Sequence, residues 1–174
     1  MSTSISVAVQ KKQPDGTYGN MYLKPEWQSY GLFAWLANVR NNEHQIVPLS
    51  MPRGFPEDLK KKIKQQEEEE HSLGFGGYDS YNPPQDSLTR SIFGDACYEV
   101  HSISWFSIEE LLAVDYDQIV EDRRNYDFHY HGSDPLPIGQ GNKETLRDFI
   151  GKTFIKDLQS FKEAGADRIL FCFD

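Results

Sequence analysis

The strongest constraint on the fold is a helical stripe of apolar residues that leads into an apolar segment. The stripe has the spacing of one face of an amphipathic helix and comprises Leu146, Phe149, Ile150, Phe154, Leu158 and Phe161. Asn142 is a suitable N-cap and Gly165 a suitable C′ residue for a helix over 142–165. The segment "DRILFCFD" (167–174) follows and predicts a buried, central strand. A long helix packed on a sheet is therefore expected.

Strands and helices alternate irregularly along the rest of the chain. The pattern predicts a strand in "SISVAVQ" (4–10), a turn at 14–16, a returning strand at 20–24, a helix over 30–42 ending at Asn41-Asn42, a strand at 45–49, a helix from Glu57, a loop over 72–87, a strand at 97–105 and a short helix opened by the capping box Ser107 and Glu110. This mixture predicts an α+β fold in one compact domain over 1–174. Its mixed, mainly antiparallel sheet would carry the long C-terminal helix and a C-terminal strand, with a mobile segment within 64–90.

Charge and hydropathy restrict the class of protein. The net charge is −9, and four of the acidic residues form one run, Glu67 to Glu70. General nucleic-acid binding is disfavoured because it needs a basic face. No apolar run approaches the ~18 residues of a membrane span, and because Met1 to Ser6 is polar we expect no signal peptide. We expect a soluble, cytoplasmic protein without cofactor, in which Cys97 and Cys172 are buried thiols.

The segment "MPRGFPEDL" (51–59) places Arg53 in a loop held by prolines and a glycine. Arginine binds carboxylate or phosphate through a planar, bidentate fork. Arg40 and Arg53 could therefore hold an anion together. Alternatively, they pair with Glu57 or Asp58 as a structural clamp.

Histidines supply two further candidate sites. His129 and His131 project from one face if "HYH" is extended, and His101 or Asp174 could complete a metal site. The alternative is a half-exposed surface pair. In the predicted strand at 97–105, His101 faces away from Ser102 and Ser104, whose hydroxyl groups could bind a ligand or satisfy a neighbouring loop. Nucleophilic catalysis there would require a base within hydrogen-bond reach.

Four motifs occur in order: "SYGLFAWLANVRNN", "MPRGFPEDL", "HSISWFSIEELLAVDYD" and "DRILFCFD". This quartet resembles a widespread family of small uncharacterised proteins encoded by bacteriophages and prophages. Phe55 stands where that family usually has leucine. The resemblance places nine residues on family motif positions: Tyr30, Arg40, Arg53, Gly54, Asp58, His101, Ser102, Ser104 and Asp174.

The resemblance implies expression in an infected bacterium but no particular activity. We expect an accessory protein that acts by binding, which blocks a host defence or regulatory protein or sequesters a small, possibly nucleotide, ligand. The alternatives are a virion component and a small metal- or nucleotide-dependent hydrolase using His101 or His129/His131. In either binding role, Arg53 and Asp58 are expected to form a fixed pair near Arg40 and His101. Ser102, Ser104 and Asp174 complete the predicted site, and the oligomeric state is left open.

Overall fold

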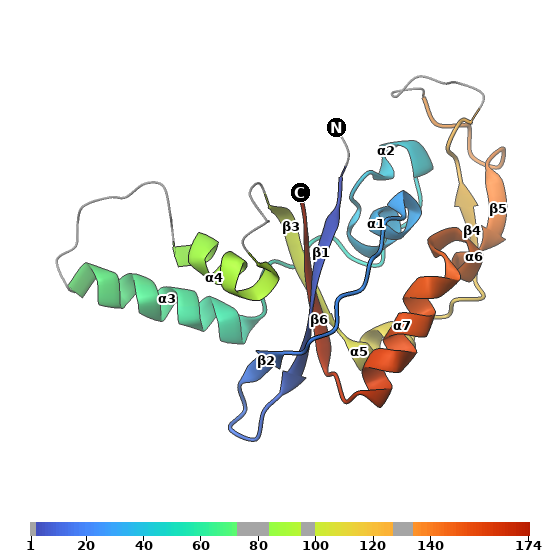
Figure 1. The fold of residues 1–174 in the computed structure, drawn as a ribbon. Coiled ribbons are helices and arrows are strands. Elements are labelled where there is room, and N and C mark those ends of the chain that lie inside the picture. The colour runs from blue at the N-terminus through green and yellow to red at the C-terminus, as the bar shows by residue number, and fades with distance from the viewer. Residues whose placement is uncertain (1–2, 73–83, 95–99, 127–133) are drawn as a thin grey trace.

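A computed structural model describes residues 3–72, 84–94, 100–126 and 134–174 (Figure 1). The elements are β1 (Ile5–Lys12), β2 (Tyr18–Asn20), α1 (Tyr30–Ala37), α2 (Asn41–His44), α3 (Glu57–Ser72), α4 (Pro84–Phe93), β3 (His101–Ser107), α5 (Ile108–Leu112), β4 (Ile119–Asp122), β5 (Asn142–Thr145), α6 (Leu146–Ile150), α7 (Lys152–Glu163) and β6 (Arg168–Phe173). Helices and a mainly antiparallel sheet confirm the predicted α+β class and the C-terminal strand.

The main sheet has the strand order β2-β1-β6-β3, and each neighbouring pair is antiparallel. All six residues of β6 are buried, which confirms the predicted central strand. Strands β4 and β5 form a separate two-stranded sheet. The returning strand of the first hairpin lies at Tyr18–Asn20, slightly earlier than the predicted 20–24.

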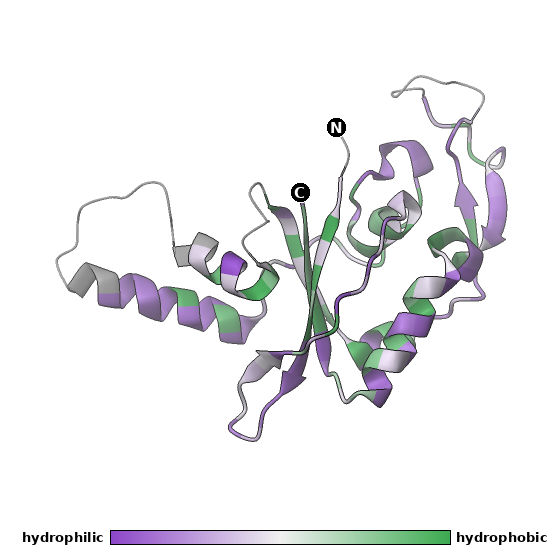
Figure 2. Cartoon of the chain, viewed as in Figure 1, coloured by the Kyte–Doolittle hydropathy of each residue, from purple (hydrophilic) through white to green (hydrophobic). Residues whose placement is uncertain are grey.

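Helices cover both faces of the main sheet. Figure 1 shows α3 and α4 on one side of the sheet and α1, α6 and α7 on the other. The larger core lies on the α1 and α7 side and includes Phe33, Phe154, Phe171 and Phe173. A smaller core beneath α3 and α4 includes Leu59 and Leu170. Figure 2 shows apolar colour on the central strands and polar colour along most of α3.

The single helix predicted over 142–165 is two helices, α6 and α7, preceded by strand β5. Asn142 lies in β5, and the N-cap is Thr145, whose hydroxyl accepts a hydrogen bond from the N–H of Asp148 at 3.2 Å. Gly151 then separates α6 from α7, with a φ of 89° that side chains other than glycine resist. Gly165 follows the end of α7 with a φ of 80°, in agreement with its predicted C′ position.

The helix predicted over 30–42 is also two helices. Asn38 ends α1 in the left-handed conformation, and its N–H donates to the carbonyl oxygen of Ala34. Arg40 is left-handed as well, with a φ of 58°. Asn41 therefore begins α2 and does not terminate the first helix.

The strand predicted at 45–49 is an irregular segment. Its buried residue is Ile46, whose backbone N–H and carbonyl groups form hydrogen bonds with the side chain of Asn41. These groups therefore need no neighbouring strand. Asn41 accepts a hydrogen bond from the N–H of Ile46 at 3.0 Å and donates to its carbonyl oxygen at 2.8 Å. Helix α4 begins at Pro84, inside the loop predicted over 72–87, and residues 73–83 of the predicted mobile segment lie outside the described residues.

The loop 51–56 crosses the outer edge of strand β3. The N–H of Gly54 donates to the carbonyl oxygen of Ile103 at 2.8 Å, and the N–H of Arg53 donates to Ser104 Oγ at 3.1 Å. Phe55 then enters the smaller core on the far face of the sheet. The rigid loop therefore carries the chain from one face to the other and covers part of an edge that could pair with another strand.

Candidate functional site

Arg53 is bound to Glu110 and not to Asp58. Its guanidinium donates to both carboxylate oxygens of Glu110, at 2.6 and 3.1 Å, and lies over the Phe106 ring with its Cζ atom 4.1 Å from the ring centre. These hydrogen bonds hold the pKa of Glu110 below its usual value, against a smaller opposing effect of burial. The predicted Arg53–Asp58 pair is therefore wrong, and Arg53 serves as a clamp between its loop and α5.

Asp58 is bound to Arg168 at the opposite end of the chain. Arg168 donates to the two carboxylate oxygens of Asp58 at 2.7 and 2.8 Å, and to Gln10 Oε1 at 2.9 Å. The hydrogen bonds from Arg168 lower the pKa of Asp58, although burial acts in the other direction. Two of the predicted binding residues, Arg53 and Asp58, thus belong to structural ion pairs.

Three other predicted residues lie at one end of the main sheet. Arg40 Nε donates to Thr3 Oγ1 at 2.8 Å, just before β1. Asp174 follows β6 and accepts a hydrogen bond from the Ser4 hydroxyl. His101 begins β3 and stacks on Phe173 of β6, with ring centres 6.0 Å apart. The sheet brings Arg40, Asp174 and His101 to the same end, away from the Asp58–Arg168 pair at the other.

A β-bulge changes the predicted facing of the β3 residues. His101 is opposite Phe173 and Ser104 is opposite Phe171, so both point to the same face of the sheet. Ser102 lies within this irregularity with a φ of 54°, and its hydroxyl is 2.9 Å from His101 Nδ1. Ser104 is fully buried. The expectation that His101 faces away from Ser104 is therefore wrong.

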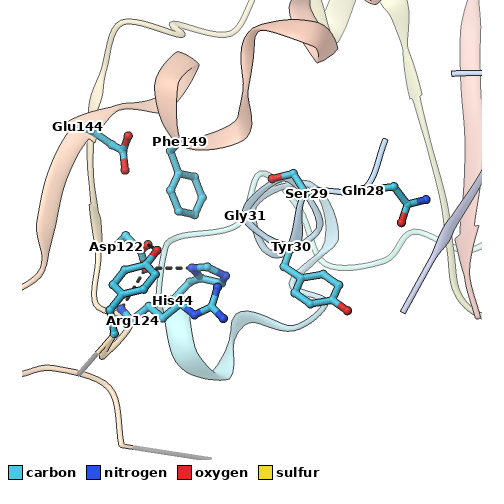
Figure 3. Close-up of a pocket in the computed structure, with 10 residues that line it drawn as sticks. Gln28, Ser29, Tyr30, Gly31, His44, Asp122, Arg124, Glu144 and Phe149 are labelled. Atoms are coloured by element: carbon cyan, nitrogen blue, oxygen red, sulfur yellow. Dashed lines mark hydrogen bonds and ion pairs between the residues drawn. The ribbon is translucent and has the colours of Figure 1, made fainter. Parts of the chain in front are cut away.

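The structure also contains a cavity of about 240 Å³ that the sequence patterns do not predict, although Ser29, Tyr30 and Gly31 of the first motif line it (Figure 3). It lies where α1, α2, β4, β5 and α6 meet. The lining residues are Gln28, Ser29, Tyr30, Gly31, His44, Asp122, Arg124, Tyr126, Glu144 and Phe149. Most of them are polar or charged, and they come from four separate regions of the sequence, 28–31, 44, 122–126 and 144–149.

His44 and Asp122 form a buried pair in the wall of this cavity. Their residues are 4% and 3% exposed, and His44 Nδ1 lies 2.9 Å from Asp122 Oδ1. An ionised carboxylate can only accept, so the proton lies on Nδ1. Asp122 also accepts from the N–H of Arg124 and the hydroxyl of Tyr126, both at 3.0 Å. Burial acts to raise the pKa of Asp122, but these three hydrogen bonds and the nearby imidazole together lower it.

The second ring nitrogen of His44, Nε2, is open to the cavity. None of the described residues forms a hydrogen bond with it. Within the described part of the chain, every fully enclosed side-chain nitrogen or oxygen has a partner, so Nε2 is not enclosed. The rings of His44 and Phe149 are nearly perpendicular, with ring centres 5.5 Å apart. Asp122 and Phe149 thus fix the imidazole while Nε2 stays available.

The first turn of α1 forms another wall of the cavity. Ser29 caps the helix by accepting a hydrogen bond from the N–H of Leu32 at 3.3 Å. The N–H groups of Tyr30 and Gly31 precede the first bond within the helix and have no acceptor among the described residues. Gly31 has no side chain, so it can line the cavity only with backbone atoms.

Charged side chains complete the cavity. Arg124 Nε lies 3.1 Å from Glu43 Oε2, and its guanidinium lies over the Tyr126 ring. Glu144 accepts one hydrogen bond from Asn142 at 2.9 Å through Oε1. Figure 3 shows Glu144 on the opposite side of the cavity from Ser29 and Gly31.

Several sequence expectations concern metals, thiols and membranes. Among the described residues, no three or more His, Cys, Asp and Glu side chains are grouped so as to hold a metal ion. His129, His131 and Cys97 lie outside the described residues, and the predictions for them are untested. Cys172 is a buried thiol, as predicted. None of the helices in the described ranges is long and apolar enough to cross a membrane.

Comparison with models of protein families, with curated proteins and with solved structures finds no match. The resemblance to phage-encoded proteins therefore stays a prediction, and function has to be argued from the geometry of this chain.

Proposed function

We propose that this chain is an accessory protein of a bacteriophage or prophage, that it acts by binding in the host cytoplasm, and that it sequesters a small ligand in the His44–Asp122 cavity. The setting comes from the resemblance of its four motifs to phage-encoded proteins. The choice of a small ligand comes from the cavity.

One observation carries the proposal: a buried histidine presents an unpartnered nitrogen to a cavity. Polar groups in protein interiors are normally paired, and because Nε2 is not enclosed its partner has to come from what occupies the cavity, either water or a ligand. His44 Nε2 has no partner in the described part of the protein. Asp122 holds the ring in one orientation, which is the preorganisation that a binding site requires.

Native mass spectrometry tests this function. The protein, purified from bacterial cells, should carry a small molecule that is absent after denaturation. His44→Phe should lose this molecule, because phenylalanine fills the ring volume without its nitrogen atoms. His101→Phe is the matched control, since that histidine lies at the end of the main sheet and should leave the bound mass unchanged. A bare wild-type chain, or a complex with a host protein alone, would contradict sequestration of a small ligand.

A second candidate function, hydrolysis, is favoured by the same pair. A carboxylate on Nδ1 orients a histidine whose Nε2 can accept a proton, which is the arrangement of a general base. Turnover would distinguish the two functions: a hydrolase releases an altered molecule, whereas a sequestering protein returns its ligand unchanged on denaturation.

A further inference from the structure

The cavity presents hydrogen-bond donors on one wall and a carboxylate on the other. We propose that its ligand is a small zwitterion of the α-amino acid class, with its carboxylate at the first turn of α1 and its ammonium group at Glu144. This inference rests on the proposed function, because it names the ligand of the same cavity.

The α1 wall suits a carboxylate. The free N–H groups at a helix N-terminus carry partial positive charge and point toward a bound anion. Gly31 exposes its backbone to the cavity, and the Ser29 hydroxyl, whose oxygen accepts from the N–H of Leu32, donates to none of the described residues. His44, which is buried, presents Nε2 to the same cavity; this nitrogen is an acceptor while Nδ1 alone carries a proton, and it donates to a carboxylate only in the imidazolium form, whose charge Asp122 would balance. The helix end is therefore supported by an independent, unpartnered group.

The β5 wall suits an ammonium group. Glu144 is partly buried, and Asn142 bonds only to Oε1, so Oε2 can accept another hydrogen bond. An ammonium group has three donors and no acceptor, and it forms its strongest hydrogen bonds with carboxylates. The aromatic ring of Phe149 also lines the cavity, beside the path between the two walls.

Charge and size favour a ligand that is neutral overall and small. The other lining carboxylate, Asp122, already accepts from three donors, and Arg124 is paired with Glu43. Among the charged side chains of the lining, this leaves Glu144 as the carboxylate without a cationic partner in the described residues, together with the donors at α1. A simple anion would share the cavity with the Glu144 carboxylate, and a simple cation would leave the α1 donors unused. The volume of about 240 Å³ lies below the ~300–1,000 Å³ of sites for drug-sized molecules.

Isothermal titration calorimetry with the twenty L-amino acids tests the ligand class. At least one should bind. Its N-acetyl derivative, which lacks the ammonium charge, and its amide, which lacks the carboxylate charge, should each bind at least about tenfold more weakly. Glu144→Gln should weaken binding of the parent amino acid by about tenfold and leave the affinity of the N-acetyl derivative unchanged. Glu163→Gln, an exposed position on α7, is the control and should bind like the wild type.

The outcomes separate this inference from the proposed function. If no amino acid binds but native mass spectrometry finds another small molecule that His44→Phe removes, the zwitterion is wrong and sequestration stands. Equal binding of an amino acid and its N-acetyl derivative, or no effect of Glu144→Gln, would also overturn the zwitterion. If no amino acid binds and the purified chain carries no small molecule, both proposals fail.

Discussion

Arg168, the first residue of β6, donates two parallel hydrogen bonds to Asp58 in the first turn of α3, at 2.7 and 2.8 Å. Arg168 is buried, and its guanidinium also lies over the Tyr18 ring, with Cζ 3.6 Å from the ring centre. The pair ties α3 to the central strand of the sheet. It is the principal charged contact between that helix and the main sheet among the described residues.

Asp58→Ala should lower the free energy of unfolding by about 2–3 kcal/mol, because it leaves the buried guanidinium of Arg168 without its carboxylate. Glu57→Ala is the matched control: Glu57 is exposed and pairs with Lys60 at the surface. That change should cost no more than about 1 kcal/mol. Urea denaturation of both variants measures the difference. Equal losses would show that the Arg168 pair contributes no more than a surface contact.

Stability should fall at acid pH. The pKa values of Asp58, Glu110 and Asp122 all lie below their ordinary values in the folded protein. The unfolded chain, with ordinary values near ~4, therefore binds protons first as the pH decreases. The stabilisation is present above about pH 4 and is lost as the pH falls through the lower folded values. Thermal melts from pH 7 to pH 3 should show this fall, with a shallower slope for Asp58→Asn. An unchanged slope would contradict the contribution of Asp58.

Gly31→Ala should destabilise the protein at the cavity wall. A Cβ atom there would lie 3.0 Å from Phe149 Cζ and 3.1 Å from the Phe149 carbonyl oxygen. Such overpacking typically costs about 1–3 kcal/mol. Phe149→Leu removes the ring contact, so the double variant should be more stable than the sum of the two single changes predicts. Chemical denaturation of the wild type, the two single variants and the double variant gives the coupling energy. Strict additivity would show that there is no steric conflict between the Cβ atom introduced at position 31 and the Phe149 ring.

Ser102 should gain from replacement by glycine. Ser102 has a φ of 54°, in the left-handed region. This conformation costs a residue with a side chain roughly 1–2 kcal/mol of conformational free energy, and glycine avoids that cost. Ser102→Gly should therefore raise the melting temperature slightly, whereas Ser102→Val should lower it, because a branched Cβ resists this conformation. The two melting temperatures decide the point. If valine is tolerated as well as glycine, the left-handed conformation at Ser102 is not a source of strain.

The sequence predicts the structure correctly where the signal for an element lies within that element. The apolar run of β6 and the Ser107–Glu110 capping box are local signals, and both appear in the structure. The breaks at Gly151 and Asn38 were missed because the apolar stripe continues across each of them. The irregular segment around Ile46 depends on the side chain of Asn41, which periodicity does not register.

The cavity was missed for a different reason. His44 and Asp122 are 78 residues apart, and neither lies in a recognisable motif. They meet because the end of α2 lies against the end of β4, where the N–H of Arg123 donates to the carbonyl oxygen of His44 at 2.9 Å. The predicted pair of Arg53 with Asp58 is wrong for the same reason, because the actual partners, Glu110 and Arg168, come from distant elements. Single-sequence patterns specify residue types in local structure and do not specify which distant residues meet.

The position of β6 affects when the sheet can form during synthesis. Strand β6 lies between β1 and β3. Its partner β1 is near the start of the sequence, so the paired residues are separated by most of the length of the chain. A nascent chain that has reached α7 therefore holds the two flanking strands of the sheet without the strand that joins them. The main sheet can form only after Arg168–Phe173 have left the ribosome. The long-range pairing of β6 with β1, a kind of contact that slows folding, is therefore delayed until this region has been translated.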